Sequence, residues 1–333
     1  MTSSNRDYRL LFTVGLIRAL DTRRLSREQW DMLTGSASIK DFMNILADTV
    51  YREHLEGAPG DHLLHEISRR RRDLLYDLVS RFSFDAGLAA LLVAGYDFHN
   101  LRVMLRESLF GRSLNELLVP WGLIEEEYMR EVFQLEQYQL FPYEMQMAVV
   151  EAVEAYYKQK DIMVMDGVID RWCYHAMLSG AKSIESDFIV RHLQLGVDCE
   201  NIETVLRALR RGEEADQVRV CMINGGTIPG DLLIESGYGE KGAISKLLSE
   251  SGYEGLVEPV MQYHEHPYVF GDASANMKGK MLRETDYLIC GSEPLYAYVQ
   301  RVEHELSVLG SIAAMTAGEI DAAEIREKVP EFW

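Results

Sequence analysis

Two ten-residue stretches decide the fold: DFHNLRVMLR at residues 97–106 and DCENIETVLR at residues 198–207. They share the pattern D-x-x-N-[LI]-x-x-x-L-R, and every matched position is displaced by 198 − 97 = 101 residues. A fixed displacement is the sequence signature of an internal structural repeat. The pattern therefore predicts repeated units of about 100 residues each.

Weaker echoes extend the repeat toward both ends of the chain. ILADTVY ends at Tyr51 and LLSESGY ends at Tyr253, and their separation, 253 − 51 = 202, is twice the first displacement. Each unit also contains a similar opening: RLSREQW from Arg24, GLIEEEY from Gly122 and GTIPGDL from Gly226. We therefore predict three units, at residues 1–112, 113–212 and 213–333.

The spacing of apolar residues indicates helices almost everywhere. Leucine, isoleucine, valine and phenylalanine recur at three and four residues through 63–82 and again through 188–209. Only 8 prolines occur in 333 residues, and most stand where a loop or a helix start is expected. VRVCMI from Val218 is the best strand-like run, but nothing alternates regularly. The expected fold class is all-α, with a few short strands at most.

The shared motif has a simple structural interpretation. We expect its aspartate to precede a helix and to accept backbone N–H groups as an N-cap, with the asparagine in the first turn and the arginine near a carboxylate or a helix end. The alternative is that an aspartate or arginine is exposed for a partner. The repeat-motif residues are Asp97, Asn100, Arg106, Asp198, Asn201 and Arg207.

Composition disfavours direct binding to nucleic acid or to an anionic membrane surface and leaves basic or neutral protein partners open. With 53 acidic and 34 basic residues the formal charge is −19, so the surface repels phosphate backbones and anionic lipid. The four cysteines form no C-x-x-C pair and are predicted to be reduced thiols. We expect no signal peptide, because arginines interrupt the N-terminal apolar residues, and no membrane-spanning segment.

Several patterns resemble sites but lack the context that a site needs. G-x-G-x-x-G occurs at Gly237, Gly239 and Gly242 without a strand before it, so a flexible loop is the preferred interpretation over a dinucleotide site. No P-loop motif exists. His62 and His65, and the His264–His266 loop, could bind a metal only if further ligands converged, and polar loops are preferred.

The charged clusters and the cysteines also have plain structural interpretations. Asp161, Asp166 and Asp170 are expected to be solvated or paired with Arg171 or Lys160. The run Arg69–Arg72 is expected to be a solvated helix beside Glu66 and Asp73. Cys173 and His175 lie two residues apart, on different faces of a helix. We predict no catalytic, cofactor or metal residues.

Longer stretches of this sequence resemble a known family. They are Val14–Tyr51, GYDFHNLRVMLRESLFG from Gly95, IDRWCYHAML from Ile169, Ser186–Gly212, MINGGTIP from Met222, EPLYAYVQRVEHELSVLGSI from Glu293 and IDAAEIREKVP from Ile320. In this order they resemble the C subunit of the prokaryotic V-type (A/V-type) ATPases, whose eukaryotic relative is the d subunit of the V-ATPase. The resemblance covers nearly the whole chain.

The resemblance implies a fold and a role. Its fold would be three similar helical units around a pseudo-threefold axis, forming a funnel. Its role would be that of a non-catalytic central-stalk subunit, present as one copy per complex at the cytoplasmic face of the cell membrane. It would link the D and F shaft subunits to the proteolipid rotor ring and transmit torque between ATP synthesis or hydrolysis and proton or sodium transport, without a cofactor, nucleic acid or small-molecule substrate.

Two alternatives stay open at this point. A free-standing helical repeat scaffold for soluble partners would occur without ATPase subunits. An enzyme that uses the glycine loop or the His264–His266 loop would carry nucleotide or stoichiometric metal after purification.

Overall fold

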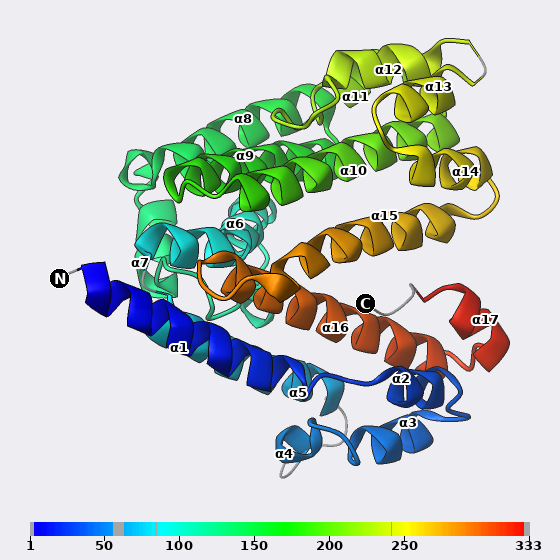
Figure 1. Cartoon of the computed structure of the whole chain (residues 1–333). Helices are drawn as coiled ribbons and strands as arrows, with labels where there is room; N and C mark the ends of the chain where they lie inside the picture. Colours follow the sequence, from blue (N-terminus) through cyan, green and yellow to red (C-terminus); the bar gives the residue numbers. More distant parts are fainter. Residues whose placement is uncertain (1–2, 56–62, 84, 241, 330–333) are drawn as a thin grey trace. The chain divides into compact units, whose positions relative to one another are not determined.

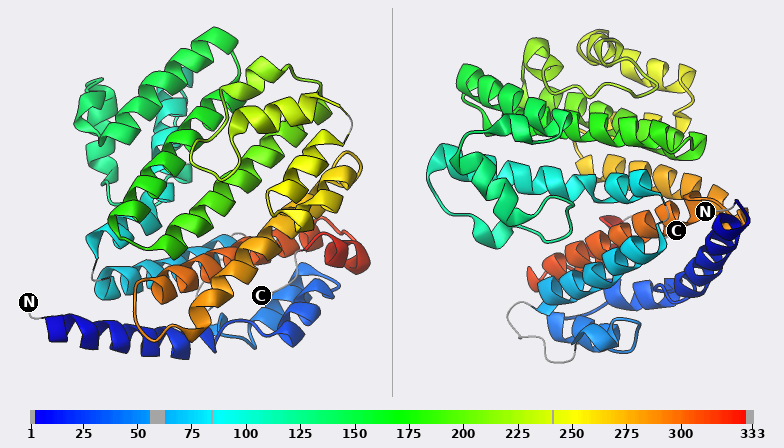
Figure 2. Two further views of the ribbon diagram at one scale, coloured as in Figure 1. Left: turned by 45° about the horizontal axis from the view of Figure 1, so that its top comes forward. Right: turned by 90° about the vertical axis from the view of Figure 1, so that its left-hand side faces the viewer.

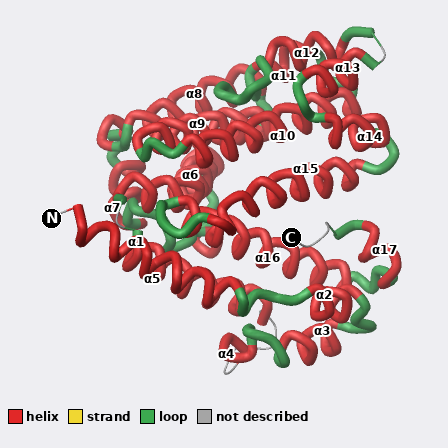
Figure 3. The backbone as a smooth tube through the Cα atoms, in the orientation of Figure 1, coloured by secondary structure: helices red, strands yellow, loops and turns green. Residues whose placement is uncertain are grey.

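Every regular element of the described chain is a helix. The computed structural model describes residues 3–55, 63–83, 85–240 and 242–329, and within these ranges no strand occurs (Figure 3). The all-α prediction is confirmed for these residues. The strand-like run from Val218 is instead the end of a short helix, α11 (Ala215–Arg219), followed by a turn.

The chain divides into two compact units. Unit 1 combines residues 1–85 with residues 266–333 and so joins the two ends of the sequence. Its helices are α1 (Ser3–Asp21), α2 (Arg27–Thr34), α3 (Ile39–Leu46), α4 (Arg52–Leu55), α5 (Leu63–Phe82), α15 (Pro267–Leu282), the 3-10 helix η4 (Arg283–Tyr287), α16 (Glu293–Ala317) and α17 (Ala322–Glu327) (Figure 1).

Unit 2 is continuous in sequence, from residue 86 to residue 265. Its further helices are α6 (Ala86–Phe110), η2 (Asn115–Leu117), α7 (Glu126–Gln134), η3 (Tyr138–Leu140), α8 (Tyr143–Gln159), α9 (Ile162–Ser183), α10 (Asp187–Arg211), α12 (Gly230–Tyr238), α13 (Ala243–Glu250) and α14 (Glu254–Gln262). Three predicted repeat units, with boundaries at 112 and 212, stay a prediction.

The core of unit 2 lies between its long helices. α9 packs against α6, α8 and α10, and α8, α9 and α10 lie side by side in both views (Figures 1 and 2). Apolar side chains that recur every three or four residues meet there; they include Leu101, Leu105, Met145, Val149, Met165 and Ile169. α10 is buried on several sides, which explains why its sequence shows so little amphipathic contrast.

The core of unit 1 is organised around α16. This helix, which lies near the C-terminal end of the sequence, packs against α1, α3 and α5, which all belong to the N-terminal part of the chain. α16 also buries charge: Arg301 is 5% exposed and pairs with Asp21 on α1 (2.9 Å) and with Asp286 (2.7 Å). Because a buried guanidinium needs partners, these contacts fix how α1 and η4 lie on α16.

Local signals explain where several helices begin and end. Ser26 and Gln29 form a capping box at the start of α2, in which each side chain bonds the other residue's backbone N–H. α10 begins after the N-cap Ser186 and ends at Gly212, whose φ of 71° is easily adopted only by a residue without a side chain.

The first prediction concerns His304 on α16. Burial, with Lys278 and Arg24 nearby, lowers the pKa of this imidazole to about 4. The folded state favours the neutral imidazole, whereas the unfolded chain protonates it near the ordinary histidine pKa. The contribution of His304 to the unfolding free energy is therefore fully present above that ordinary pKa and is lost as pH falls toward 4. Between pH 7 and pH 4 we expect the wild type to lose about 3 kcal/mol of unfolding free energy relative to His304→Gln.

Urea denaturation of both proteins at a series of pH values measures this difference. His65 on α5 is exposed and provides the matched control, His65→Gln. Equal pH dependence in wild type and His304→Gln would contradict the prediction.

Candidate functional site: carboxylate anchors and the cavity between α9 and α10

The first copy of the motif ties a loop to the middle of α6. The Asp97 carboxylate is buried and accepts the backbone N–H groups of Leu123 (3.2 Å) and Ile124 (3.0 Å). Three residues later, the Asn100 side chain donates to the carbonyl of Val119 (2.8 Å) and accepts its N–H (2.9 Å). Burial raises the pKa of Asp97, and the two backbone donors oppose the rise.

The second copy repeats this arrangement on α10. Asp198 is fully buried and accepts the backbone N–H groups of Thr227 (2.9 Å) and Ile228 (3.1 Å) and the hydroxyl of Tyr253 (2.5 Å). Asn201 exchanges two hydrogen bonds with the backbone of Ile223, both 2.8 Å long. Each motif therefore works as an anchor: an aspartate and an asparagine hold the loop that follows their helix.

A glycine in each loop makes the anchor possible. A Cβ atom on Gly122 would overlap Oδ1 of Asp97, and one on Gly226 would overlap Oδ1 of Asp198. Only a residue without a side chain lets the carboxylate approach the backbone this closely. This requirement explains the glycine in the repeated openings GLI and GTI.

A third carboxylate anchor lies on α16, where the sequence motif is absent. Glu305 is 3% exposed and accepts the backbone N–H of Leu25 (3.2 Å) and the hydroxyl of Tyr51 (2.6 Å). Tyr51 and Tyr253 are the residues that the two sequence echoes align, and each donates to a buried carboxylate. Sequence reasoning missed Glu305; the signal available was the alignment of Tyr51 with Tyr253.

The N-cap interpretation of the motif is wrong. Asp97 and Asp198 lie inside helices of 25 residues, eleven positions after their first residues (97 − 86 = 198 − 187 = 11). Their acceptor role was predicted, but the donors belong to a distant loop and not to the first turn of the same helix. The local sequence does not separate the two cases, because a short carboxylate side chain accepts backbone N–H groups equally well at a helix start and in the middle of a helix.

The two motif arginines have different surroundings. Arg106 pairs with Asp166 on α9, and Arg102, one turn earlier, pairs with Asp170. Arg207 donates to the hydroxyl of Thr204 (3.4 Å) and forms no ion pair with any described residue. Arg171 pairs with Glu151 instead, so its predicted pairing with these aspartates is wrong. The other predicted possibility, exposure to solvent, is confirmed for Asp161 and Asp170 and not for Asp166, whose side chain is 24% exposed.

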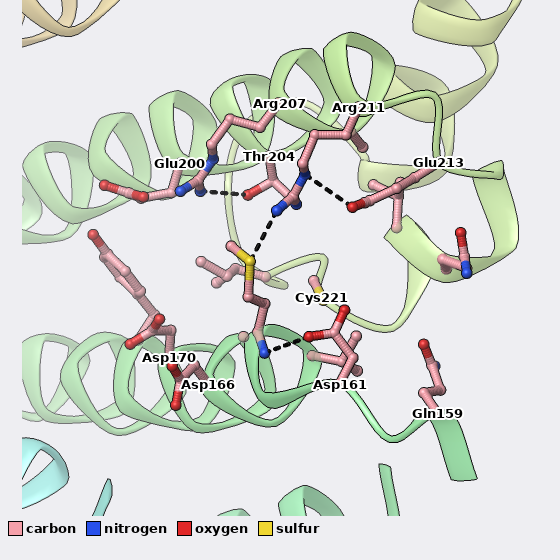
Figure 4. Close-up of a pocket in the computed structure, with 18 of the residues that line it drawn as sticks. Gln159, Asp161, Asp166, Asp170, Glu200, Thr204, Arg207, Arg211, Glu213 and Cys221 are labelled. Atoms are coloured by element: carbon pink, nitrogen blue, oxygen red, sulfur yellow. Dashed lines mark hydrogen bonds and ion pairs between the residues drawn. The ribbon is translucent and has the colours of Figure 1, made fainter. Parts of the chain in front are cut away.

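A cavity of about 440 Å³ lies between α9 and α10, beside these ion pairs. In Figure 4, Arg207 and Arg211 extend from α10, and Asp166 and Asp170 stand on α9 opposite them. Arg211 pairs with Glu213 (2.9 Å). Burial raises the pKa of Asp170, although Arg102 opposes the rise.

The thiol and the carboxylates that line the cavity are not arranged for a reaction. Its thiol, Cys221, has a pKa raised by burial, so the nucleophilic thiolate form is disfavoured. Cys173, elsewhere on α9, has a pKa raised by burial to about 12. The carboxylates Asp166 and Asp170 are engaged by arginines that also join α6 to α9. The arrangement braces helices, and we assign it no reaction.

The glycine pattern has a packing explanation. Gly237 lies in the last turn of α12, where a Cβ atom would overlap Val205 of α10, and Gly242 precedes α13 with φ 91°. No strand precedes the pattern within the described residues. The glycines therefore allow α12 to approach α10 and the chain to turn.

The histidine patterns gather no further ligands among the described residues. His266 stands just before α15, with its ring against that of Tyr268, and His62 lies outside the described ranges. No group of three or more histidine, cysteine, aspartate or glutamate side chains there could hold a metal ion. Likewise, none of the described helices is long and apolar enough to cross a bilayer.

The arginine run is more engaged than expected. Arg69 pairs with Glu66 and Asp73, the two carboxylates beside which the run was expected to lie solvated. Arg72, however, pairs with Glu303 on α16 (2.9 Å), and Arg71 contacts the hydroxyl of Tyr298 (3.4 Å). The run therefore helps to hold α5 on α16.

The second prediction tests the Asp198 anchor. Asp198→Ala would leave buried backbone N–H groups and the Tyr253 hydroxyl without their acceptor, so we expect the unfolding free energy to fall by about 3 kcal/mol. Asp216→Ala is the control, because the Asp216 side chain is 97% exposed. Urea denaturation measures both, and a loss no greater than the control's would show that Asp198 holds nothing.

The third prediction tests the glycine requirement. Gly226→Ala would push Asp198 away from its donors, and we expect a loss of about 2 kcal/mol. The control is Gly310→Ala on α16, where nothing lies within 4 Å of the added Cβ. That control should be neutral or slightly stabilising, because alanine favours helix. Equal melting temperatures for the two variants would refute the steric argument.

Comparison with known proteins extends across the same elements. The family model for the ATP synthase (C/AC39) subunit matches residues 13–328. The C subunit of the A-type ATP synthase from a Desulfurococcus species is 24% identical over 95% of this chain and 89% of its own length. The corresponding protein of Thermoplasma acidophilum is 24% identical over 90% and 91%.

A third relative is similar over about three quarters of the chain. The C subunit of the V-type sodium ATPase from Enterococcus hirae is 20% identical over 74% of this chain and 75% of its own length. The family match includes all three carboxylate anchors, since Leu25, Asp97, Asp198 and Glu305 fall between residues 13 and 328. This chain therefore belongs to the C/AC39 family, the C subunits of the V/A-type ATP synthases.

Proposed function

We propose that this chain is the non-catalytic central-stalk subunit of a V/A-type ATPase. It links the D and F shaft subunits to the proteolipid ring and transmits torque between ATP synthesis or hydrolysis and proton or sodium transport. The observation that carries the proposal is the extent of the family match, which runs from residue 13 to residue 328. The chain resembles its relatives as a whole protein and not through one shared domain.

The way the helices are held together suits this role. A spacer that transmits torque must resist deformation, and densely packed helices are poorly compressible. Here, hydrogen bonds and ion pairs inside each unit join elements far apart in sequence: Arg301 of α16 reaches Asp21 of α1, and Arg106 of α6 reaches Asp166 of α9. Such ties oppose the sliding of one helix along another.

The position in the cell follows from the same proposal. The subunit would be peripheral, at the cytoplasmic face of the cell membrane, with one copy in each complex and pseudo-threefold symmetry in its own fold. It would have no nucleic-acid or small-molecule substrate. The net charge of −19 supports the absence of a nucleic-acid substrate, because it would repel phosphate backbones.

The fourth prediction tests the proposal directly. If this chain is tagged in its native cell and purified from detergent-solubilised membranes, catalytic, shaft and ring subunits should accompany it at one copy of this chain per complex. Quantitative mass spectrometry measures the stoichiometry. An unrelated tagged membrane-associated protein is the control for adventitious recovery.

The contrary result would favour a different class of protein. Recovery of the chain from the soluble fraction, with soluble partners and without ATPase subunits, would indicate the helical repeat scaffold and overturn the proposed role.

A further inference from the structure

The α7 region of unit 2, residues 116–140, exposes both apolar and acidic side chains. It consists of α7 and the loops on either side, and we call it the α7 face. Its apolar members are large side chains between 42% and 62% exposed: Leu117, Leu123, Tyr128, Leu135 and Leu140. Its acidic members, also exposed, are Glu116, Glu125, Glu127, Glu131 and Glu136.

Helical spacing brings several of these side chains to one side of α7. The inner side of the helix is defined by Met129 and Val132, which are fully buried in the core of unit 2. Tyr128, Glu131 and Leu135 follow one another at three and four residues on the outer side. The outer side of α7 therefore presents apolar and acidic groups together.

The α7 face is held in place by the rest of unit 2. Asp97 binds the backbone at Leu123, and the hydroxyl of Tyr128 donates to the carbonyl of Leu140 (3.1 Å). Arg130 joins α7 to η2 through a hydrogen bond to Asn115 (2.5 Å). Because these contacts order the face in advance, a partner would lose little conformational freedom of this chain on binding.

The charge of the face is strongly one-sided. Residues 114–141 contain six glutamates and one arginine, a net charge of 1 − 6 = −5. The arginine, Arg130, is already paired with Glu126 (3.0 Å) and Glu107 (3.6 Å). The five glutamates of the face form no ion pair with any described residue. Uncompensated carboxylates around exposed apolar side chains favour a cationic partner and oppose anionic lipid.

We propose that the α7 face docks a basic amphipathic helix of another protein. Leucines of such a helix would cover Tyr128, Leu135 and Leu140, which helical spacing and the hydrogen bond from Tyr128 to Leu140 bring together, and its lysines or arginines would meet the neighbouring glutamates. We choose a helix as the partner because an amphipathic helix carries apolar side chains on one side and charged side chains next to them. It can therefore contact the exposed apolar residues and the glutamates of the α7 face at the same time. This inference names a surface and a partner chemistry that the proposed function leaves open.

The fifth prediction uses a defined probe. A fluorescent helical peptide with leucines at i, i+3, i+4 and i+7 and lysines elsewhere should bind the full chain, more weakly as salt concentration rises. Glu127→Gln/Glu131→Gln/Glu136→Gln should weaken binding at least tenfold, measured by fluorescence anisotropy. Glu235→Gln/Glu254→Gln/Glu265→Gln is the matched control, because it removes the same charge from other exposed positions of unit 2. Equal affinities of the two triple variants would overturn the proposal.

The natural partner can be identified in the purified native assembly. A photo-crosslinking amino acid at position 135, with position 140 as a second site, should form a crosslink to a helix of positive net charge. Crosslinks only to lipid, only to acidic segments or to no molecule at both positions would contradict the inference. Since recovery of the ATPase subunits is scored separately in the same purification, failure of the α7 face and failure of the proposed function are distinguishable.

Discussion

The structure depends on carboxylates that are buried inside long helices. A buried carboxylate is costly unless hydrogen-bond donors surround it, and here the donors are backbone N–H groups of a loop or tyrosine hydroxyls. The buried carboxylate of each anchor is therefore hydrogen-bonded only when the loop that supplies its donors adopts one particular conformation. The glycines at 122 and 226 belong to the same constraint, because the carboxylate occupies the space of their missing side chains.

The Glu305 anchor explains how the ends of the sequence come to share one unit. Its donors, at Leu25 and Tyr51, lie in the N-terminal segment, while the carboxylate lies on α16 near the C-terminus. Arg301, one turn away on the same helix, binds Asp21. Two buried charged side chains therefore hold the N-terminal helices on α16, and neither could be left unpaired at low cost.

The same anchors serve the proposed role. A non-catalytic coupling subunit needs stiffness inside and selectivity at its surface, and unit 2 shows both kinds of feature. Asp97 connects the two: its carboxylate binds the backbone N–H of Leu123, and the loop that contains Leu123 leads into α7. Anchoring inside the unit thereby orders a surface that we propose to be a docking site.

The helical class, the repeated motif and the family could all be predicted from the sequence, because apolar periodicity, a fixed displacement and an ordered series of matches are properties of the chain alone. The role of the motif depends on packing. An aspartate that accepts backbone N–H groups looks the same in sequence whether its donors are two or twenty-seven residues away (124 − 97 = 27), so local pattern wrongly predicts Asp97 at a helix start. Arg106 and Arg207 are equivalent by pattern, yet of the two only Arg106 forms an ion pair with a described aspartate, since partners supplied by another helix depend on tertiary contacts and not on local spacing.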